Sequence, residues 1–96
     1  MAHIDAGTVI SADAEVVGCT LAEGSALLDL KTYVYYSLNE VGAFVWDALE
    51  QPVRFDQLVG EVAAEFDAPR DRIAADLRRL LTQLDAAGLV RCAQPA

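Results

Sequence analysis

The order of apolar and polar residues changes character once along the chain, close to Asn39. Ahead of this point, short runs of β-branched and other apolar residues are separated by turn-forming residues, a pattern typical of β-strands. Behind it, apolar residues recur three and four positions apart, as they do on the buried face of an α-helix. The pattern therefore predicts a sheet followed by helices.

Three strands are predicted before Asn39. They cover residues 15–22, 26–30 and 33–38, with turns at 23–25 and 31–32 and a shorter extended piece at 8–12. Such short connections favour antiparallel neighbours in a meander, whose last strand is an edge unless a later segment covers it. Gly18 is expected at a bulge or a close approach to another element. Asp29 is expected to face outward if Leu28 and Leu30 face the core.

Three helices are predicted after Asn39, whose side chain is suited to cap the first of them. Pro52 is expected to end the first helix, Pro69 to open the third, and Gly88 to cap its end in the left-handed conformation. The residues expected to face inward are Val41, Phe44, Val45, Ala48 and Leu49 in the first helix, Phe55, Leu58, Val59, Val62, Ala63 and Phe66 in the second, and Ile73, Leu77, Leu80, Leu81 and Leu84 in the third.

The predicted elements indicate an α+β fold, a three-stranded antiparallel sheet followed by three helices, similar to a winged helix-turn-helix. Residues 89–92 could form a short return strand or a docked tail. The 96 residues suit a single domain, and 54% of them are hydrophobic, enough for one core without metal or disulfide staples. Residues 1–7 and 93–96 are expected to be frayed ends.

The chain carries a net charge of −8, which disfavours nucleic acid and anionic membrane surfaces as partners. No apolar run approaches the ~20 residues that a membrane span needs, and the N-terminus lacks the pattern of a secretory signal. A cytoplasmic location is therefore expected.

Metal binding and catalysis both lack suitable side chains. His3 is the lone histidine, and Cys19 and Cys92 fit no zinc-ligand spacing, so they are expected to be reduced thiols. No nucleophile with a neighbouring base stands out, and there is no glycine-rich phosphate loop. We expect a protein that is not an enzyme and needs no metal or cofactor.

Four arginines on the third predicted helix raise the alternative of a DNA-binding winged helix. They are Arg70, Arg72, Arg78 and Arg79. Asp71 and Asp76 lie among them, and little positive charge occurs elsewhere, whereas recognition helices belong to basic domains or faces. Pairing along the helix, for instance between Arg72 and Asp76, explains these charges equally well.

All three tyrosines fall on the last predicted strand, as Tyr33, Tyr35 and Tyr36. This strand lacks the lysine, proline or bulge with which proteins usually protect a free sheet edge. One interpretation is structural, with alternate residues packing the core. The other is that an extended peptide adds there as a further strand, with main-chain hydrogen bonds giving affinity and side-chain pockets giving specificity.

Three stretches resemble the PqqD-like family. They are LLDLKTYVYYSLNEVGAFVWDAL (27–49), FDQLVGEVAAEFD (55–67) and DLRRLLTQLDAAGLV (76–90), and the likeness extends over about residues 16–91. The family includes the pyrroloquinoline-quinone biosynthesis protein D and the leader-binding proteins of lasso-peptide biosynthesis, together called precursor-peptide recognition elements. The first stretch looks closer to the lasso-peptide branch.

The resemblance implies that a leader peptide adds antiparallel to the third strand, in a groove against the third helix. The matching residues are Tyr33, Val34, Tyr35, Tyr36 and Ser37 on the strand, and Ile73, Asp76, Leu77 and Leu80 on the helix. Which face of the strand looks into the groove stays open. Two positions depart from the family pattern: Arg54 stands where a capping hydroxyl is expected, and Tyr33 is larger than the expected turn residue.

The resemblance further implies a non-catalytic adaptor that binds the leader and presents the precursor to a modifying enzyme. In the lasso branch this partner is a leader peptidase acting with a cyclase, and in the quinone branch it is a radical SAM enzyme. Tethering would act by raising the local concentration of the substrate. Trp46 is a candidate for the enzyme-facing surface, or is tucked against the neighbouring strand. A DNA-binding winged helix and a plain structural subunit are the alternatives.

Overall fold

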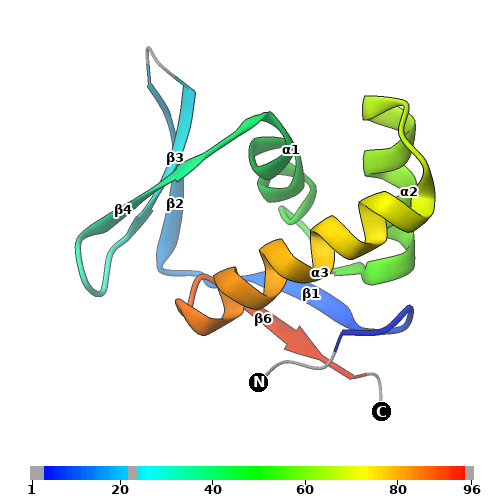
Figure 1. The fold of residues 1–96 in the computed structure, drawn as a ribbon. Helices are drawn as coiled ribbons and strands as arrows, with labels where there is room; N and C mark the ends of the chain where they lie inside the picture. The colour runs from blue at the N-terminus through cyan, green and yellow to red at the C-terminus, as the bar shows by residue number, and fades with distance from the viewer. Residues whose placement is uncertain (1–3, 22–23, 95–96) are drawn as a thin grey trace.

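Two antiparallel sheets and three helices make up the computed structural model, which describes residues 4–21 and 24–94 (Figure 1). One sheet contains β2 (Val16–Leu21), β3 (Gly24–Asp29) and β4 (Val34–Leu38) in this order. The helices are α1 (Glu40–Ala48), α2 (Phe55–Phe66) and α3 (Arg70–Ala86). The three-stranded antiparallel sheet and three helices expected from the sequence are therefore confirmed.

The sheet β2-β3-β4 is the predicted meander, with β4 at its edge. In Figure 1 it lies on the opposite side of α1 from α2. Its register pairs Gly18 with Leu27, and Leu27 in turn with Tyr36, without a bulge at Gly18. Of the predicted turn at 23–25, Glu23 lies outside the described residues, and Gly24 and Ser25 belong to β3.

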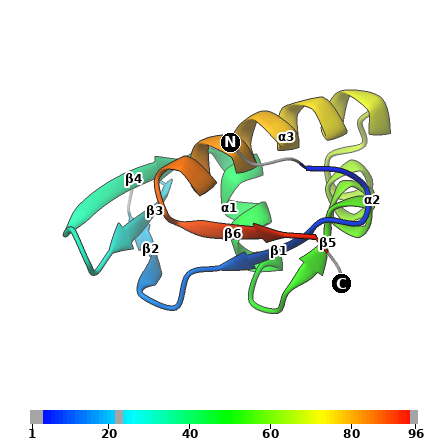
Figure 2. The same ribbon diagram turned by 90° about the horizontal axis from the view of Figure 1, so that it is seen from below.

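A second sheet joins three segments that are far apart in the sequence. Its strands are β1 (Val9–Ala12), β5 (Val53–Arg54) and β6 (Val90–Ala93), with β1 in the centre (Figure 2). β6 pairs with β1 through contacts such as Ile10 with Cys92. The C-terminal segment is thus a return strand, and it extends the second sheet and leaves β4 uncovered.

The helix boundaries follow the local chemistry of the sequence. Asn39 caps α1 as predicted, because its side-chain oxygen accepts the amide hydrogen of Gly42 at 2.8 Å. α1 ends at Ala48, ahead of Pro52. Arg54 precedes α2 and makes no side-chain capping bond. Gly88 follows α3 with a φ of 78°, the left-handed conformation expected of it.

The core lies between the helices and the inner faces of both sheets. The predicted inward residues Val45, Leu49, Phe55, Leu58, Val59, Val62, Ile73, Leu77, Leu81 and Leu84 are buried, and the others, Leu80 among them, are half-buried against them. Ile4 also belongs to this core, so the chain is anchored close to the start of its described part.

The prediction for Asp29 was wrong. Its side chain is 2% exposed, whereas Leu30 is exposed in the following turn. β3 places Leu27 and Asp29 on its inner face, one residue out of step with the prediction. Burial of the carboxylate is stabilised because Oδ1 of Asp29 accepts the backbone N–H of Lys31 at 2.9 Å, which also holds the turn.

Candidate functional site

β4 has one open edge among the described residues. It pairs with β3 on one side, Tyr35 lying opposite Leu28 and Tyr36 opposite Leu27. On its other side no strand of the described chain pairs with it, since β6 belongs to the second sheet. The tyrosine-bearing strand is therefore available to a further strand, as the sequence predicted.

The hydrogen-bonding pattern of the sheet indicates which residues of β4 face this edge. The N–H of Leu30 donates to the carbonyl of Glu15 at 2.8 Å, in step with the β2–β3 register. Since backbone groups of successive residues point to opposite sides of a strand, the odd-numbered residues of β3, such as Leu27, face β4. Their partners on β4, such as Tyr36, face β3, so Tyr35 and Ser37 turn their N–H and C=O groups toward the open edge.

The side chains of β4 alternate between two faces. Tyr36 and Leu38 are half-buried and pack against the core. Val34 shares their face but lies near the end of the sheet, and it is 44% exposed. Tyr35 lies on the other face and is 62% exposed, as expected for a residue with no element over it. The face that looks toward the helices is thus the face of Val34, Tyr36 and Leu38.

Tyr33 is the one tyrosine that does not lie in the strand, which begins at Val34. Its φ of 59° is left-handed, and its N–H donates to the carbonyl of Asp29 at 2.7 Å, closing the β3–β4 turn. The predicted start of the strand at Tyr33 was therefore wrong. A left-handed position normally favours glycine or asparagine, yet here it carries a tyrosine whose side chain is 77% exposed.

A hollow of about 210 Å³ lies between the start of α1 and the middle of α3. Its lining residues are Asn39, Val41, Asp76, Leu77, Arg79 and Leu80. Because Asn39 follows β4 directly, the hollow lies where the open strand runs into α1. Its walls are apolar and carry one acidic and one basic side chain. Such a lining suits an extended peptide that inserts an apolar side chain and keeps its polar backbone near the two charges.

The structure brings together some of the helix residues expected in a groove. Asp76, Leu77 and Leu80 line the hollow, while Ile73 is 6% exposed, belongs to the core and does not line it. Asp76 is exposed, and the predicted ion pair between Asp76 and Arg72 does not form in the described part of the chain.

Sequence reasoning missed Asn39, Val41 and Arg79 as lining residues of the hollow. Asn39 and Val41 had been assigned to helix capping and to the core, and both also contribute to this surface. Arg79 lies three residues after Asp76, so a helical projection around Asp76 could have indicated it.

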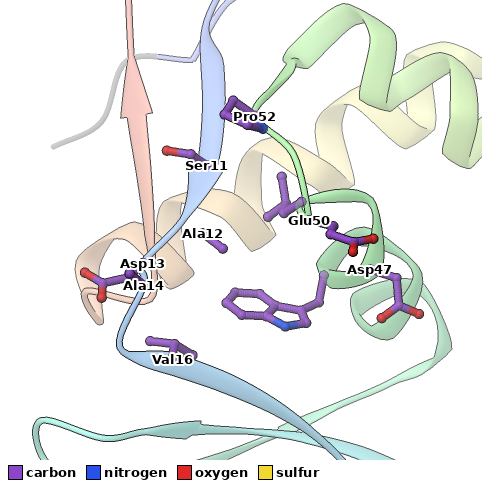
Figure 3. A pocket seen from close by; sticks show the side chains of 10 residues that line it. Ser11, Ala12, Asp13, Ala14, Val16, Asp47, Glu50 and Pro52 are labelled. Atoms are coloured by element: carbon purple, nitrogen blue, oxygen red, sulfur yellow. The ribbon is translucent and has the colours of Figure 1, made fainter.

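A larger hollow of about 520 Å³ opens on a different part of the surface (Figure 3). Asp13 lies on one side of it and Asp47 and Glu50 on the other, and Trp46 also lines it. A backbone hydrogen bond from Glu15 and the ammonium group of Lys31 hold the pKa of Asp13 below its ordinary value of 3.8. Its carboxylates make this hollow unsuited to anions, and it does not adjoin the open edge of β4.

Two of the four α3 arginines are engaged within the fold. Nε of Arg78 donates to the carbonyl of Ile4 at 3.1 Å, and its guanidinium lies 5.0 Å from the ring centre of Phe55. Arg70 donates to the carbonyl of Asp56 at 3.4 Å. Arginines that are tied to neighbouring elements in this way do not form the free basic stripe that phosphate binding requires.

The described part of the chain offers neither a metal site nor a membrane-spanning helix. Within residues 4–21 and 24–94, no group of three or more histidine, cysteine, aspartate or glutamate side chains is arranged to hold a metal ion. In the same part of the chain, no helix has both the length and the apolar character to cross a membrane.

Comparison with solved structures gives two matches. The first is TbiB1 in complex with the TbiA(beta) leader peptide, with 30% sequence identity, a TM-score of 0.76, and coverage of 84% of this chain and 94% of that one. The second is lasso peptide synthetase B1 complexed with the leader peptide, with 20% identity, a TM-score of 0.70, and coverage of 85% and 96%. At that identity the second match supports the fold alone.

Comparison with curated proteins gave no match. Among protein families, the one described as coenzyme PQQ synthesis protein D (PqqD) matches residues 24–90, which include β3, β4 and all three helices. This range spans more than half of the chain, and it contains both the open edge and the neighbouring hollow. The chain therefore belongs to the PqqD family.

Proposed function

We propose that the chain binds the leader segment of a ribosomally made precursor peptide as an additional strand on β4, and holds the precursor for a separate modifying enzyme. The observation that carries the proposal is the open edge of β4, with the backbone groups of Tyr35 and Ser37 directed toward it. Strand addition to such an edge is an established mode of peptide recognition.

The hollow beside β4 supplies the selectivity that main-chain bonds lack. Each net hydrogen bond contributes about 0.5–1.5 kcal/mol, so the open edge alone gives modest affinity for any extended chain. Leader side chains on the helix-facing side of the added strand would approach Val34 and Tyr36, and beyond them Leu77 and Leu80. Asp76 flanks this surface, Ile73 supports it from the core, and Tyr33 borders it at the turn.

The similarity to TbiB1, which was solved with a leader peptide, supports the same role and favours a lasso-peptide pathway. In that pathway the modifying enzyme is a leader peptidase acting with a cyclase. A radical SAM enzyme is the corresponding partner in the quinone pathway to which the family's description refers. The adaptor itself carries out no chemistry and needs no cofactor, and it works in the cytoplasm, where precursors are made.

Titration of a fluorescently labelled leader, monitored by polarisation, tests the proposal. The labelled probe is the TbiA(beta) leader peptide, with which TbiB1 was solved. Tyr35→Pro removes an N–H at the open edge but none that faces β3, so the fold should persist while leader affinity falls at least tenfold. Tyr35→Phe keeps the N–H and should bind the leader nearly as well as the wild type. Unchanged affinity in the proline variant would overturn the proposal.

A further inference from the structure

An apolar row on the outer face of the β2-β3-β4 sheet is exposed at both of its ends. It runs straight across the three strands, because Val17 pairs with Leu28 and Leu28 with Tyr35. Leu28 is half-buried between its neighbours, while Val17 is 39% exposed and Tyr35 62%. We name the row Val17–Leu28–Tyr35 the outer row.

Exposed apolar side chains gather on this part of the molecule. In the described part of the chain, all the large hydrophobic residues with exposed side chains belong to the β2-β3-β4 sheet or its β3–β4 turn. They are Val17 and Tyr35 on the outer face, Leu30 and Tyr33 in the adjoining turn, and Val34 on the helix-facing side of β4. A soluble domain that is otherwise covered by charged residues rarely concentrates its exposed apolar surface unless a partner covers that surface.

Tyr33, in the turn next to the outer row, is unusual in both its backbone conformation and its exposure. Tyr33 holds a left-handed backbone conformation with its ring in solvent. For a residue other than glycine this conformation costs on the order of 1 kcal/mol, and the exposed ring adds no packing within the chain. The ring is therefore available to a contact outside the chain.

The outer row ends at the edge where the leader is proposed to bind. In an antiparallel ladder, two directly paired residues point to the same face of the sheet. The leader residue opposite Tyr35 therefore lies beside the Tyr35 ring, and the outer row continues from Val17 across the protein into the leader. Anything seated on this face contacts the adaptor and the bound leader together.

We infer that the modifying enzyme docks on the outer face of the β2-β3-β4 sheet, through an apolar patch that covers the outer row and the adjoining outward side chains of the bound leader. Docking of this kind presupposes the proposed function, because the leader completes the surface. The outer row carries no charge, so recognition rests on apolar burial, and the charged remainder of the domain stays outside the contact.

Continuity of the two surfaces has a thermodynamic consequence. Since the enzyme touches the leader as well as the protein, it binds the loaded adaptor more tightly than the empty one. By linkage, the enzyme must then strengthen leader binding by the same factor. Selective capture of the loaded adaptor keeps the enzyme from being occupied by empty adaptor molecules.

The test uses the full chain, a leader peptidase of a lasso-peptide pathway, and the TbiA(beta) leader peptide. The variant Val17→Asp places a charge on the exposed end of the outer row that lies on β2, two strands away from the open edge. The side chain of Val17 is 39% exposed and no backbone N–H is lost, so fold and open edge persist. Leader affinity should stay within threefold of the wild type, while affinity for the peptidase, measured by calorimetry with leader present, should fall at least tenfold.

Glu61→Gln, on the exposed surface of α2, is the matched control and should leave both affinities unchanged. Equal peptidase affinity in the wild type and in Val17→Asp would overturn the inference, as would equal affinity with and without leader. Sedimentation could instead show that the chain self-associates through this face. If Val17→Asp abolished that self-association but kept its peptidase affinity, the face would belong to a second copy and the inference would be overturned. Failure of the wild type to bind leader would instead overturn the proposed function, which the leader titration detects separately.

Discussion

The indole nitrogen of Trp46 lies 3.0 Å from the position that a Cβ atom on Gly18 would occupy. Gly18 is on the inner face of β2, so the lack of a side chain lets the ring of α1 rest directly on the strand. The close approach predicted from the sequence is thereby confirmed. Trp46 is half-buried by this contact, which accounts for the ring without an enzyme-binding role.

Gly18→Ala should destabilise the protein, because a Cβ at 3.0 Å forces the indole to move. Overpacking costs typically about 1–3 kcal/mol, and the entropic benefit of replacing a strand glycine offsets about 0.5–1 kcal/mol of it. We expect a net loss of about 1–2 kcal/mol in the free energy of unfolding by urea denaturation. As Trp46 is the single tryptophan, its fluorescence emission should shift in the folded variant. Val17→Thr, one residue back on the outer face, should leave the emission unchanged. An unshifted spectrum in Gly18→Ala would contradict the contact.

Asp13 links the connection after β1 to two other parts of the fold. Its Oδ2 lies 3.2 Å from Nζ of Lys31 in the β3–β4 turn and 3.8 Å from a guanidinium nitrogen of Arg91 in β6. Its Oδ1 accepts the N–H of Glu15 at 2.8 Å. The hydrogen bonds and ion pairs to the carboxylate lower the pKa of Asp13.

Because the pKa of Asp13 is lowered in the folded state, the charged carboxylate stabilises the fold above its unfolded pKa, and this stabilisation is lost as the pH falls through the folded pKa. Asp13→Asn can still accept the Glu15 N–H through Oδ1, but it loses the charge and the Oδ2 acceptor that Lys31 and Arg91 face. The variant should be less stable than the wild type at about pH 6, and the difference should shrink once the pH falls well below 3.8. Urea denaturation at both pH values measures this, and a difference independent of pH would show that the charge of Asp13 is not the cause.

Asn39→Ala should destabilise α1 by about 1 kcal/mol, the usual effect of losing an N-cap side chain. The carboxamide oxygen of Asn39 accepts from Gly42 at 2.8 Å, and no other side chain is placed to replace it. Thermal unfolding followed by circular dichroism gives the change, and Asn39→Ser, which restores a capping oxygen, should recover most of it. If Asn39→Ser is as unstable as Asn39→Ala, the cap is not what Asn39 contributes.

The sequence predicted most of the fold where local periodicity decides it. Each helix carries its own repeat of apolar residues, and the meander β2-β3-β4 is joined by short turns, so both follow from nearby residues. The second sheet did not follow, because its β5 strand has only two residues and pairs with β1 more than forty positions away. The sequence also did not predict which residues of β3 face the core. Nothing in the local pattern of Leu28, Asp29 and Leu30 shows that the carboxylate of Asp29 is buried and holds a turn.

Part of the candidate site could also be predicted, namely the part that depends on residues close together in the sequence. The open edge follows from the order of strands and the tyrosine-rich segment, both visible in the sequence. The hollow depends on how α1 meets α3, a long-range relation, and it admits Asn39, Val41 and Arg79 while leaving Ile73 in the core. Helical periodicity groups Ile73 with Leu77 and Leu80 on one face, but does not show where that face passes from core to surface.

Leu80→Asp should weaken leader binding about tenfold. Leu80 is half-buried and lines the hollow beside β4, so an apolar leader side chain placed there would bury surface against it. Loss of this contact, worth about 1.4 kcal/mol, corresponds to a tenfold change in affinity, and the added charge next to Asp76 increases the loss for an acidic leader. Asp85→Ala, farther along α3, is the control and should bind normally. Polarisation titration with the labelled leader measures both variants, after circular dichroism has shown them to be folded. Normal binding by Leu80→Asp would mean that the added strand does not reach the hollow, and that affinity resides in the edge of β4 alone.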